Sequence, residues 1–418
     1  MSNTSSKTQS AVHRIAARWI WSGAGAPRAG TIAFESGRIL EITDAASGAV
    51  DDDFGHALIV PGFVNAHVHL DLTLAPQSER LEIPFTRWLL SVRDARELSG
   101  PAGLTQAAIG GVELLVKSGT TTLVDYDSRG FSLAALASSP MRRLVLREVI
   151  ALRAESPLDE SELEDFLDGA RGIAREERGL APHAPYTVRL DALKSSIRLA
   201  RRRRVPWSMH IAEQPDEARF IRDQSGSFAE FLAGLKLSTS GLLSGAESAV
   251  LALERLGLLA DRPLLVHGNY LTARDIAALA AHVVSVVYCP RSHAWFGHAP
   301  HPLEALLATG VNVALGTDGL ISNGALSMLA ELRAVRAAHP RLTAERVLAL
   351  ATTAAHTALD GRFGSGRIAL GEPADFAVIA LPRDVVRPAD RVLDAILAGA
   401  GEVCATYIAG DCVYRAGA

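Results

Sequence analysis

The chain has 418 residues, of which 48% are hydrophobic and 21% are charged, and its formal net charge is −4. This length and composition predict a globular protein with one large α/β core and a smaller appendage, or with two domains. The charge balance shows no basic surplus, so we expect no nucleic-acid partner, and no uninterrupted apolar run is long enough to span a membrane.

Cysteine usage and the N-terminal stretch indicate the compartment. The three cysteines, Cys289, Cys404 and Cys412, are odd in number and show no paired metal-binding spacing, so we expect no disulfide framework. Residues 1–10 are polar and lack the apolar core of a secretory signal. We therefore expect a cytoplasmic protein that acts on a small-molecule substrate.

The two ends of the chain carry short strand-like segments separated by glycine, proline and aspartate turns. These segments cover residues 14–21, 31–35 and 38–43 near the N-terminus, and residues 375–381 and 405–414 near the C-terminus. We expect both ends to pair into one small β-sandwich, built from residues 1–57 and 366–418.

Residues 58–365 alternate strand-like and helix-like segments, which is typical of a parallel sheet wrapped by helices. Eight apolar, β-branched runs occur, at residues 58–69, 120–126, 143–151, 179–184, 206–212, 263–268, 283–289 and 311–316. Eight such units close a (β/α)8 barrel of the TIM type, whose active site lies at the C-terminal ends of its strands. The predicted fold class is therefore α/β, a (β/α)8 barrel with a small β-sandwich.

Polar side chains collect at the C-terminal ends of these predicted strands. They are His67 and His69 on the first strand, His183 on the fourth, His210 on the fifth, His267 on the sixth and Asp318 on the eighth. The chain has only 13 histidines, and structural histidines have no reason to gather at one end of successive strands. Because histidine is the commonest metal ligand, this pattern predicts a metal centre.

Four motifs surround these positions: LIVPGFVNAHVHLD at residues 58–71, MHIAE at 209–213, LGTDG at 315–319 and IALGEPADFAVI at 368–379. Together they resemble the amidohydrolase superfamily, in the branch of cytosine, guanine and adenosine-type deaminases and related chlorohydrolases. The resemblance covers nearly the whole chain. It implies that the metal ligands are His67, His69, His210 and Asp318.

The implied ligand set suits a single divalent ion, Zn²⁺ first and Fe²⁺ as the alternative. Three neutral imidazoles and one carboxylate leave a position open for water, whose pKa such an ion lowers to about 7. Two-metal relatives use a carboxylated lysine, and the third and fourth predicted strands contain no lysine.

The same resemblance implies the catalytic residues. His267 orients substrate or water, Glu213 carries protons to the ring nitrogen and the leaving amine, and Asp318 also accepts the proton of the water. Glu213 follows His210 by three residues, so it would face away on a continuing strand. We therefore expect the chain to leave the strand near Ala212.

Four further side chains are expected to contact substrate, namely Trp88, Arg147, His183 and His298. Trp88 is expected on a long loop after the first strand, with packing in a helix core as the alternative. Arg147, like Glu148 beside it at the end of the third strand, could recognise a carboxylate or ribose hydroxyls, with an internal ion pair as the alternative. The aromatic and histidine content of residues 288–298 suits a flat ring, with packing over the barrel mouth as the alternative.

These features predict a metal-dependent aminohydrolase. We expect hydrolytic deamination of an amino-substituted heterocycle, first a purine or purine-nucleoside-like compound, by metal-bound hydroxide with release of ammonia. The alternative enzyme is a chlorohydrolase or amidase that uses the same site. A non-catalytic metabolite-binding barrel is the alternative of another class, and it predicts an eroded site, whereas every expected position is filled. The resemblance also implies a homodimer or a larger assembly.

Overall fold

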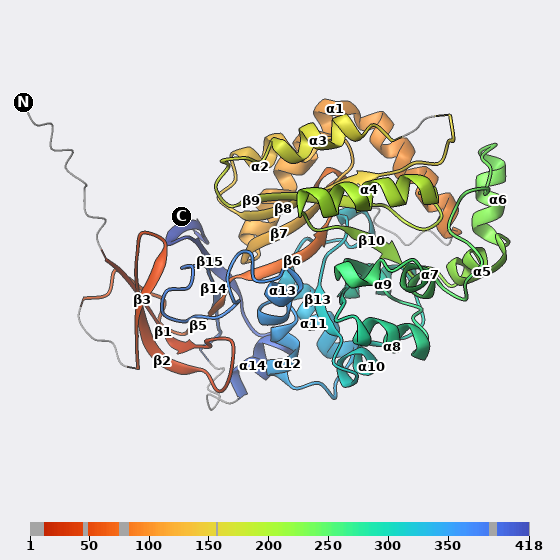
Figure 1. Cartoon of the computed structure of the whole chain (residues 1–418). Helices are drawn as coiled ribbons and strands as arrows, with labels where there is room; N and C mark the ends of the chain where they lie inside the picture. Colours follow the sequence, from red (N-terminus) through yellow and green to blue (C-terminus); the bar gives the residue numbers. More distant parts are fainter. Residues whose placement is uncertain (1–11, 45–48, 75–82, 156–157, 384–390, 418) are drawn as a thin grey trace, which may run out of the picture.

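The computed structural model describes residues 12–44, 49–74, 83–155, 158–383 and 391–417. The polar stretch 1–10 lies outside these ranges. Figure 1 shows a sheet near both chain ends on one side, and a larger part of strands and helices on the other. Within the described ranges, no helix is long and apolar enough to cross a membrane.

Both chain ends contribute to one eight-stranded sheet. Its order is β16-β15-β14-β5-β1-β2-β3, and β4 pairs with β1. The bounds are β1 His13–Ile20, β2 Arg28–Glu35, β3 Arg38–Thr43, β4 Asp52–Asp53, β5 Ala57–Pro61, β14 Phe376–Ala380, β15 Glu402–Ile408 and β16 Asp411–Arg415. The two ends meet where β14 runs antiparallel to β5. The chain ends therefore pair as expected, and their arrangement as a sandwich stays a prediction.

Two parallel four-stranded sheets form the larger part, in the orders β6-β7-β8-β9 and β10-β11-β12-β13. The bounds are β6 Phe63–Val68, β7 Thr120–Asp127, β8 Arg142–Val149, β9 Glu176–Pro182, β10 Ser208–Ile211, β11 Leu264–His267, β12 Ser285–Tyr288 and β13 Asn312–Leu315. Each predicted barrel run therefore contains a strand. The α/β class with parallel strands is confirmed.

Backbone hydrogen bonds join the two parallel sheets at both edges. The Leu180 amide of β9 donates to the Pro206 carbonyl at 3.1 Å, and the His210 amide of β10 donates to the carbonyl of His183, just after β9, at 2.9 Å. On the other side, the amide of Thr317 donates to the carbonyl of His67 at 3.0 Å. The C-terminal ends of strands from both sheets are thereby brought together.

The single strand predicted over residues 58–69 is wrong, because the structure divides it at Gly62. A side chain at Gly62 would place its Cβ 2.3 Å from the Thr121 side chain, so only glycine fits this close approach. The first half, β5, joins the chain-end sheet, and the second half, β6, begins the parallel sheet.

A register shift in β6 between Asn65 and Val68 changes which side chains face inward. Before the shift, Val64 belongs to the cluster between the parallel strands, whereas Val68 after it packs in the outer cluster with the helices. Such a bulge re-aims the side chains that follow it. His67 and His69 consequently face the interior.

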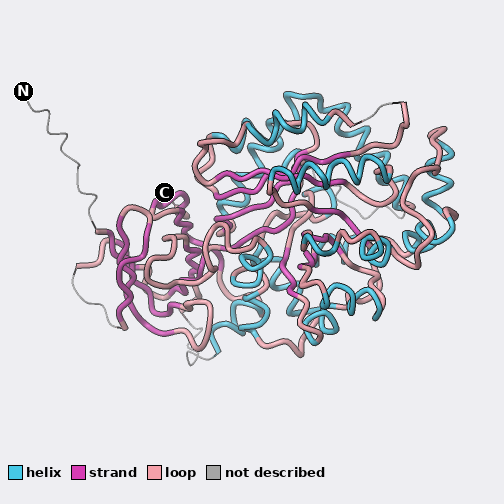
Figure 2. Tube along the Cα trace, in the orientation of Figure 1, coloured by secondary structure: helices cyan, strands magenta, loops and turns pink. Residues whose placement is uncertain are grey.

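Helices cover the parallel strands (Figure 2). Their bounds are α1 Phe85–Lys117, α2 Phe131–Ala137, α3 Glu160–Asp168, α4 Leu190–Arg203, α5 Asp216–Asp223, α6 Ser227–Gly234, α7 Ala249–Arg255, α8 Ala273–Ala281, α9 Pro290–Phe296, α10 Leu303–Ala308, α11 Met328–Ala338, α12 Ala344–Ala349, α13 Thr353–Ala358, α14 Val392–Leu397, η1 Leu70–Leu72, η2 Leu259–Asp261 and η3 Leu320–Ser322. In α4, Leu193, Ile197 and Ala200 recur at helical spacing and are buried, while Arg201 and Arg202 are exposed. This pattern anchors the helix on the sheet.

Helix α1 corrects the expectation of a long loop carrying Trp88. It runs from Phe85 to Lys117 with a kink at Gly100, whose φ of 59° is left-handed, followed by Pro101. Proline removes a helical hydrogen bond and glycine tolerates this φ, so the pair accounts for the kink. Trp88 therefore lies on a helix.

Candidate active site

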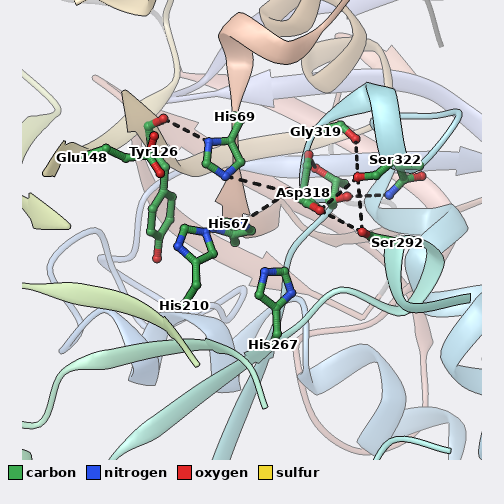
Figure 3. Close-up of polar contacts among 12 residues, drawn as sticks. His67, His69, Tyr126, Glu148, His210, His267, Ser292, Asp318, Gly319 and Ser322 are labelled. Carbon is green, nitrogen blue, oxygen red and sulfur yellow. Dashed lines mark hydrogen bonds and ion pairs between the residues drawn. The ribbon is translucent and has the colours of Figure 1, made fainter. Parts of the chain in front are cut away.

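Histidines and carboxylates converge where the parallel strands end (Figure 3). Three groups of ligand atoms lie within 4.8 Å of one another: His67 with His210 and His267, His67 with His69 and Asp318, and His69 with Glu148 and His210. All of these side chains are buried. The structure therefore brings together all four of the predicted ligands.

Asp318 is held at both carboxylate oxygens. Its Oδ1 lies 3.5 Å from His67 Nε2 and 3.8 Å from His69 Nε2. Its Oδ2 accepts hydrogen bonds from Ser292 Oγ at 2.8 Å and from Ser322 Oγ at 3.0 Å. The two hydroxyls fix the carboxylate so that Oδ1 faces the imidazoles.

The far nitrogens of two imidazoles are bound to backbone carbonyls. His69 Nδ1 donates to Tyr126 O at 3.2 Å, and His210 Nδ1 donates to His183 O at 2.9 Å. These bonds fix the tautomer and leave Nε2 facing the cluster. His67 is fully buried, and neither of its ring nitrogens has a hydrogen-bond partner in the described part of the chain. Buried nitrogens without a partner fit a bound metal ion.

Burial sets the charge state of the cluster. It lowers the pKa of His69 and His210 well below the ordinary value and lowers the pKa of His267 to about 3, so these rings are neutral near pH 7. Burial would raise the pKa of Asp318, but contact with His67 lowers it below its ordinary range. Neutral imidazoles and an ionised carboxylate are the forms that bind divalent metals.

Three strand ends leave the second parallel sheet through left-handed backbone. The φ angles are 47° at Ala212, 71° at His267 and 60° at Asp318. Strand β10 ends at Ile211, so the expected exit near Ala212 is confirmed. Non-glycine residues adopt such angles at a cost, and they cluster at functional sites.

The exit at Ala212 brings Glu213 to the cluster. Glu213 Oε1 lies 3.8 Å from His267 Nε2. The turn is held by the Glu217 carboxylate, which accepts from the Ala212 amide at 2.6 Å, and by Asn269, whose amide nitrogen donates to the Glu213 carbonyl at 3.1 Å. Burial, together with the charge of Asp318, raises the pKa of Glu213 well above its ordinary value.

Two of the four predicted substrate contacts, Arg147 and Trp88, have other partners in the structure. Arg147 does not reach the cluster, because its guanidinium pairs with Asp127 at 3.2 Å and lies over the ring of Phe166. Trp88 is buried in an aromatic cluster, with ring centroids 4.9 Å from Phe296 and 6.2 Å from Trp295. Arg147 therefore forms the internal ion pair and Trp88 packs in a helix core, which were the alternatives to substrate contact for these two residues.

The other two predicted contacts lie near the cluster. The ring of His183 is 4.8 Å from that of His210, and its Nδ1 is 2.8 Å from Thr187 Oγ1. His298 Nδ1 lies 3.1 Å from the hydroxyl of Tyr270, three residues beyond His267.

Glu148, considered from the sequence beside Arg147 for contact with a carboxylate or with ribose hydroxyls, is the one of the two that reaches the cluster. Leu144 and Leu146 face the interior of the parallel strands, and Glu148 has the same parity on β8. Burial raises the pKa of Glu148 to about 8, partly offset by the charge of Arg96. The period of two along β8 is the signal that separates Glu148 from Arg147.

Parallel strands that present imidazoles and a carboxylate at their C-terminal ends are the arrangement of metal-dependent α/β hydrolases. The chain belongs to the amidohydrolase family, whose family model matches residues 58–413. The resemblance read from the sequence motifs is thereby confirmed.

Proteins similar in sequence to this chain include deaminases. The chain is 30% identical over 401 residues to a 5-methylthioadenosine/S-adenosylhomocysteine deaminase of Pyrococcus furiosus, which covers 91% of this chain and 90% of that protein. It is 29% identical over 362 residues to an aminodeoxyfutalosine deaminase of Nitratiruptor sp., covering 84% and 85%. Among solved structures, an adenosine deaminase from Xanthomonas campestris with bound zinc superposes with a TM-score of 0.82 at 25% identity, covering 96% and 92%.

Proposed function

We propose that this chain is a metal-dependent aminohydrolase that removes the exocyclic amine of a purine-nucleoside-like substrate. The observation that carries the proposal is the buried cluster at the strand ends. In it, neither ring nitrogen of His67 has a hydrogen-bond partner among the described residues, and Glu213 Oε1 lies 3.8 Å from His267 Nε2. The relatives named above, which are deaminases of adenosine derivatives and of aminodeoxyfutalosine, support the substrate class.

The ligands proposed are His67, His69, His210 and Asp318, and the ion proposed is Zn²⁺. The donor set of three neutral imidazoles and one carboxylate supports this choice, as does the zinc in the related adenosine deaminase. When bound at such a site, a divalent ion lowers the pKa of a water ligand to about 7 and supplies a nucleophile at neutral pH.

The proton transfers belong to the side chains. In the net reaction a C–N bond breaks, a C–O bond to water forms, and the amine leaves as ammonia. Glu213 donates its proton to the ring nitrogen beside the reacting carbon, then takes up the second proton of the added water and passes it to the leaving amine. Asp318 accepts the proton of the attacking water, and His267 orients the water or the developing charge. The proton that Asp318 accepts from the attacking water returns to Glu213 and restores both groups.

We also propose that the two parallel sheets close into a (β/α)8 barrel. The hydrogen bonds that join them at both edges support closure.

We further propose that the protein is a homodimer and that it acts in the cytoplasm. Light scattering of the purified chain measures the mass of the particle, and a monomer at micromolar concentration would contradict the dimer.

A substrate panel tests the proposed function. Matched purine nucleosides with an amino, chloro or acylamino group on the same carbon are incubated with the purified enzyme. Release of ammonia, chloride and carboxylic acid is measured for each. We expect ammonia from the amino compound at the highest kcat/KM. Chloride or acid released faster than ammonia would replace the deaminase with the chlorohydrolase or amidase alternative.

A further inference from the structure

Glu148 is a buried carboxyl that the mechanism above does not use. Its side chain is 2% exposed, and its Oε1 has no hydrogen-bond partner among the described residues. A buried acceptor without a partner is costly unless a ligand provides the donor. The unpaired oxygen therefore indicates a ligand group that carries an N–H or O–H.

The neighbours of Glu148 leave its oxygen available. His183 Nε2 is 3.8 Å from Glu148 Oε1, beyond hydrogen-bond length, and the other ring nitrogen of His183 contacts Thr187 Oγ1 at 2.8 Å. Arg96 is the nearby positive charge, but it donates from Nε and Nη2 to Asp71 at 3.0 and 3.2 Å. Both polar neighbours therefore have other partners.

The position of Glu148 identifies the part of the substrate that it would meet. A carboxyl oxygen of Glu148 lies within 4.8 Å of the ligand nitrogens of His69 and His210, so Glu148 borders the cluster beside two of the proposed metal ligands. In Figure 3, Glu148 lies on one side of His69 and Asp318 lies on the other. The reacting carbon must approach the proposed ligands, so a group on that carbon would lie closer to Glu148 than a remote sugar would.

We propose that Glu148 selects the leaving group, by accepting a hydrogen bond from the exocyclic amine of the substrate. This inference rests on the proposed deaminase function. An amine presents N–H donors to Glu148, whose carboxyl group keeps an acceptor oxygen in either protonation state, whereas a chloro, alkoxy or alkylthio group presents only lone pairs. Glu148 forms and breaks no covalent bond in the reaction. A site built to hydrogen-bond a donor discriminates strongly against an analogue that lacks it.

The test compares two purine nucleosides, one with an amino group and one with chlorine on the reacting carbon. Parent enzyme, Glu148→Gln and Glu148→Leu are assayed for kcat/KM on both, with the exposed Glu247→Gln as a matched control. Because Leu removes the acceptor, we expect the amino-to-chloro ratio to fall at least tenfold in Glu148→Leu and by less in Glu148→Gln. The control should keep the parent ratio.

Two further measurements distinguish recognition of the leaving group from binding of the rest of the substrate and from metal binding. The inhibition constant of the purine nucleoside without a substituent on that carbon should change less than threefold in Glu148→Gln, because Glu148 meets only the leaving group. Metal content should stay at the parent level. Loss of metal would place Glu148 among the ligands and overturn the proposal, and so would an unchanged ratio in both variants.

Failure of the proposed function gives a different result. A parent enzyme that releases chloride in preference to ammonia overturns both proposals. If the parent acts on neither nucleoside, the deaminase proposal fails, and calorimetric binding of the two compounds to the parent and Glu148→Leu tests the preference directly. Equal loss of affinity for both compounds would then overturn the role of Glu148, and selective loss for the amino compound would support it.

Discussion

The two parallel sheets supply the same cluster by different backbone devices. In β6 to β9, a bulge between Asn65 and Val68 aims His67 and His69, and no described non-glycine residue at the C-terminal strand ends is left-handed. In β10 to β13, three strand ends are left-handed, at Ala212, His267 and Asp318. Backbone strain is therefore concentrated in the second sheet, beside the groups that handle protons.

The chemical contributions of the sheets differ in the same way. The second sheet provides two proposed metal ligands, His210 and Asp318, and also Glu213 and His267, which are proposed to carry protons and to orient the water without binding the metal. The first sheet provides two proposed metal ligands and Glu148. The comparison implies that loss of Glu213 or His267 from the second sheet lowers turnover more than metal content, whereas loss of a proposed ligand from either sheet lowers metal content.

Glu213→Gln is expected to have the largest effect on turnover. Glutamine keeps the size and hydrogen bonding but carries no proton, so kcat should fall by roughly 100- to 10,000-fold, towards the upper end because Glu213 acts more than once per cycle. Metal content should remain near one ion per chain. The exposed Glu230→Gln serves as a control with parent kcat, and activity of Glu213→Gln within tenfold of the parent would exclude it as the proton carrier.

His67→Ala and His210→Ala test whether both sheets hold the ion. Each variant removes one of four proposed ligands, so metal per chain should fall at least tenfold after equal dialysis, measured by elemental analysis. His282→Ala, at the C-terminal end of α8 and outside the cluster, should retain the parent content. Two ions per parent chain would contradict the single-metal proposal.

His267→Asn separates orientation from ligation. The asparagine should retain the metal and lower kcat by on the order of 100-fold, about 3 kcal/mol, because it removes a preorganised group near the developing charge. Ligand atoms of His267, His67 and His210 lie within 4.8 Å of one another, so the variant decides between the two roles. Complete loss of metal would make His267 a ligand.

Ala212→Gly measures the strain in the second sheet and has the smallest expected effect. Glycine tolerates the φ of 47°, so the free energy of unfolding should rise by about 0.5 to 1 kcal/mol. The matched control Ala277→Gly, on an exposed face of α8, should lower it by about 1 kcal/mol. The free energy of unfolding is measured by urea denaturation. An equal decrease in both variants would show that the backbone at Ala212 stores no strain.

Much of the architecture followed from local patterns. Apolar, β-branched runs located the strands, and the ends of these runs located His67, His210 and Asp318. The division at Gly62 was missed because a contact with Thr121, distant in the sequence, creates it. Trp88 was expected on a loop, since the Gly100–Pro101 pair breaks the helical pattern. Arg147 and Glu148 were considered together, and only Glu148 reaches the cluster because successive side chains on a strand face opposite sides.

The central claim is that this site catalyses deamination only with a metal ion bound by both sheets. Ammonia release from the aminopurine nucleoside is measured before chelation, after chelation and after addition of Zn²⁺, with metal per chain determined at each stage. We expect one ammonia per substrate consumed, loss of activity with the metal, and recovery at about one ion per chain. Full ammonia release by metal-free protein would contradict the claim.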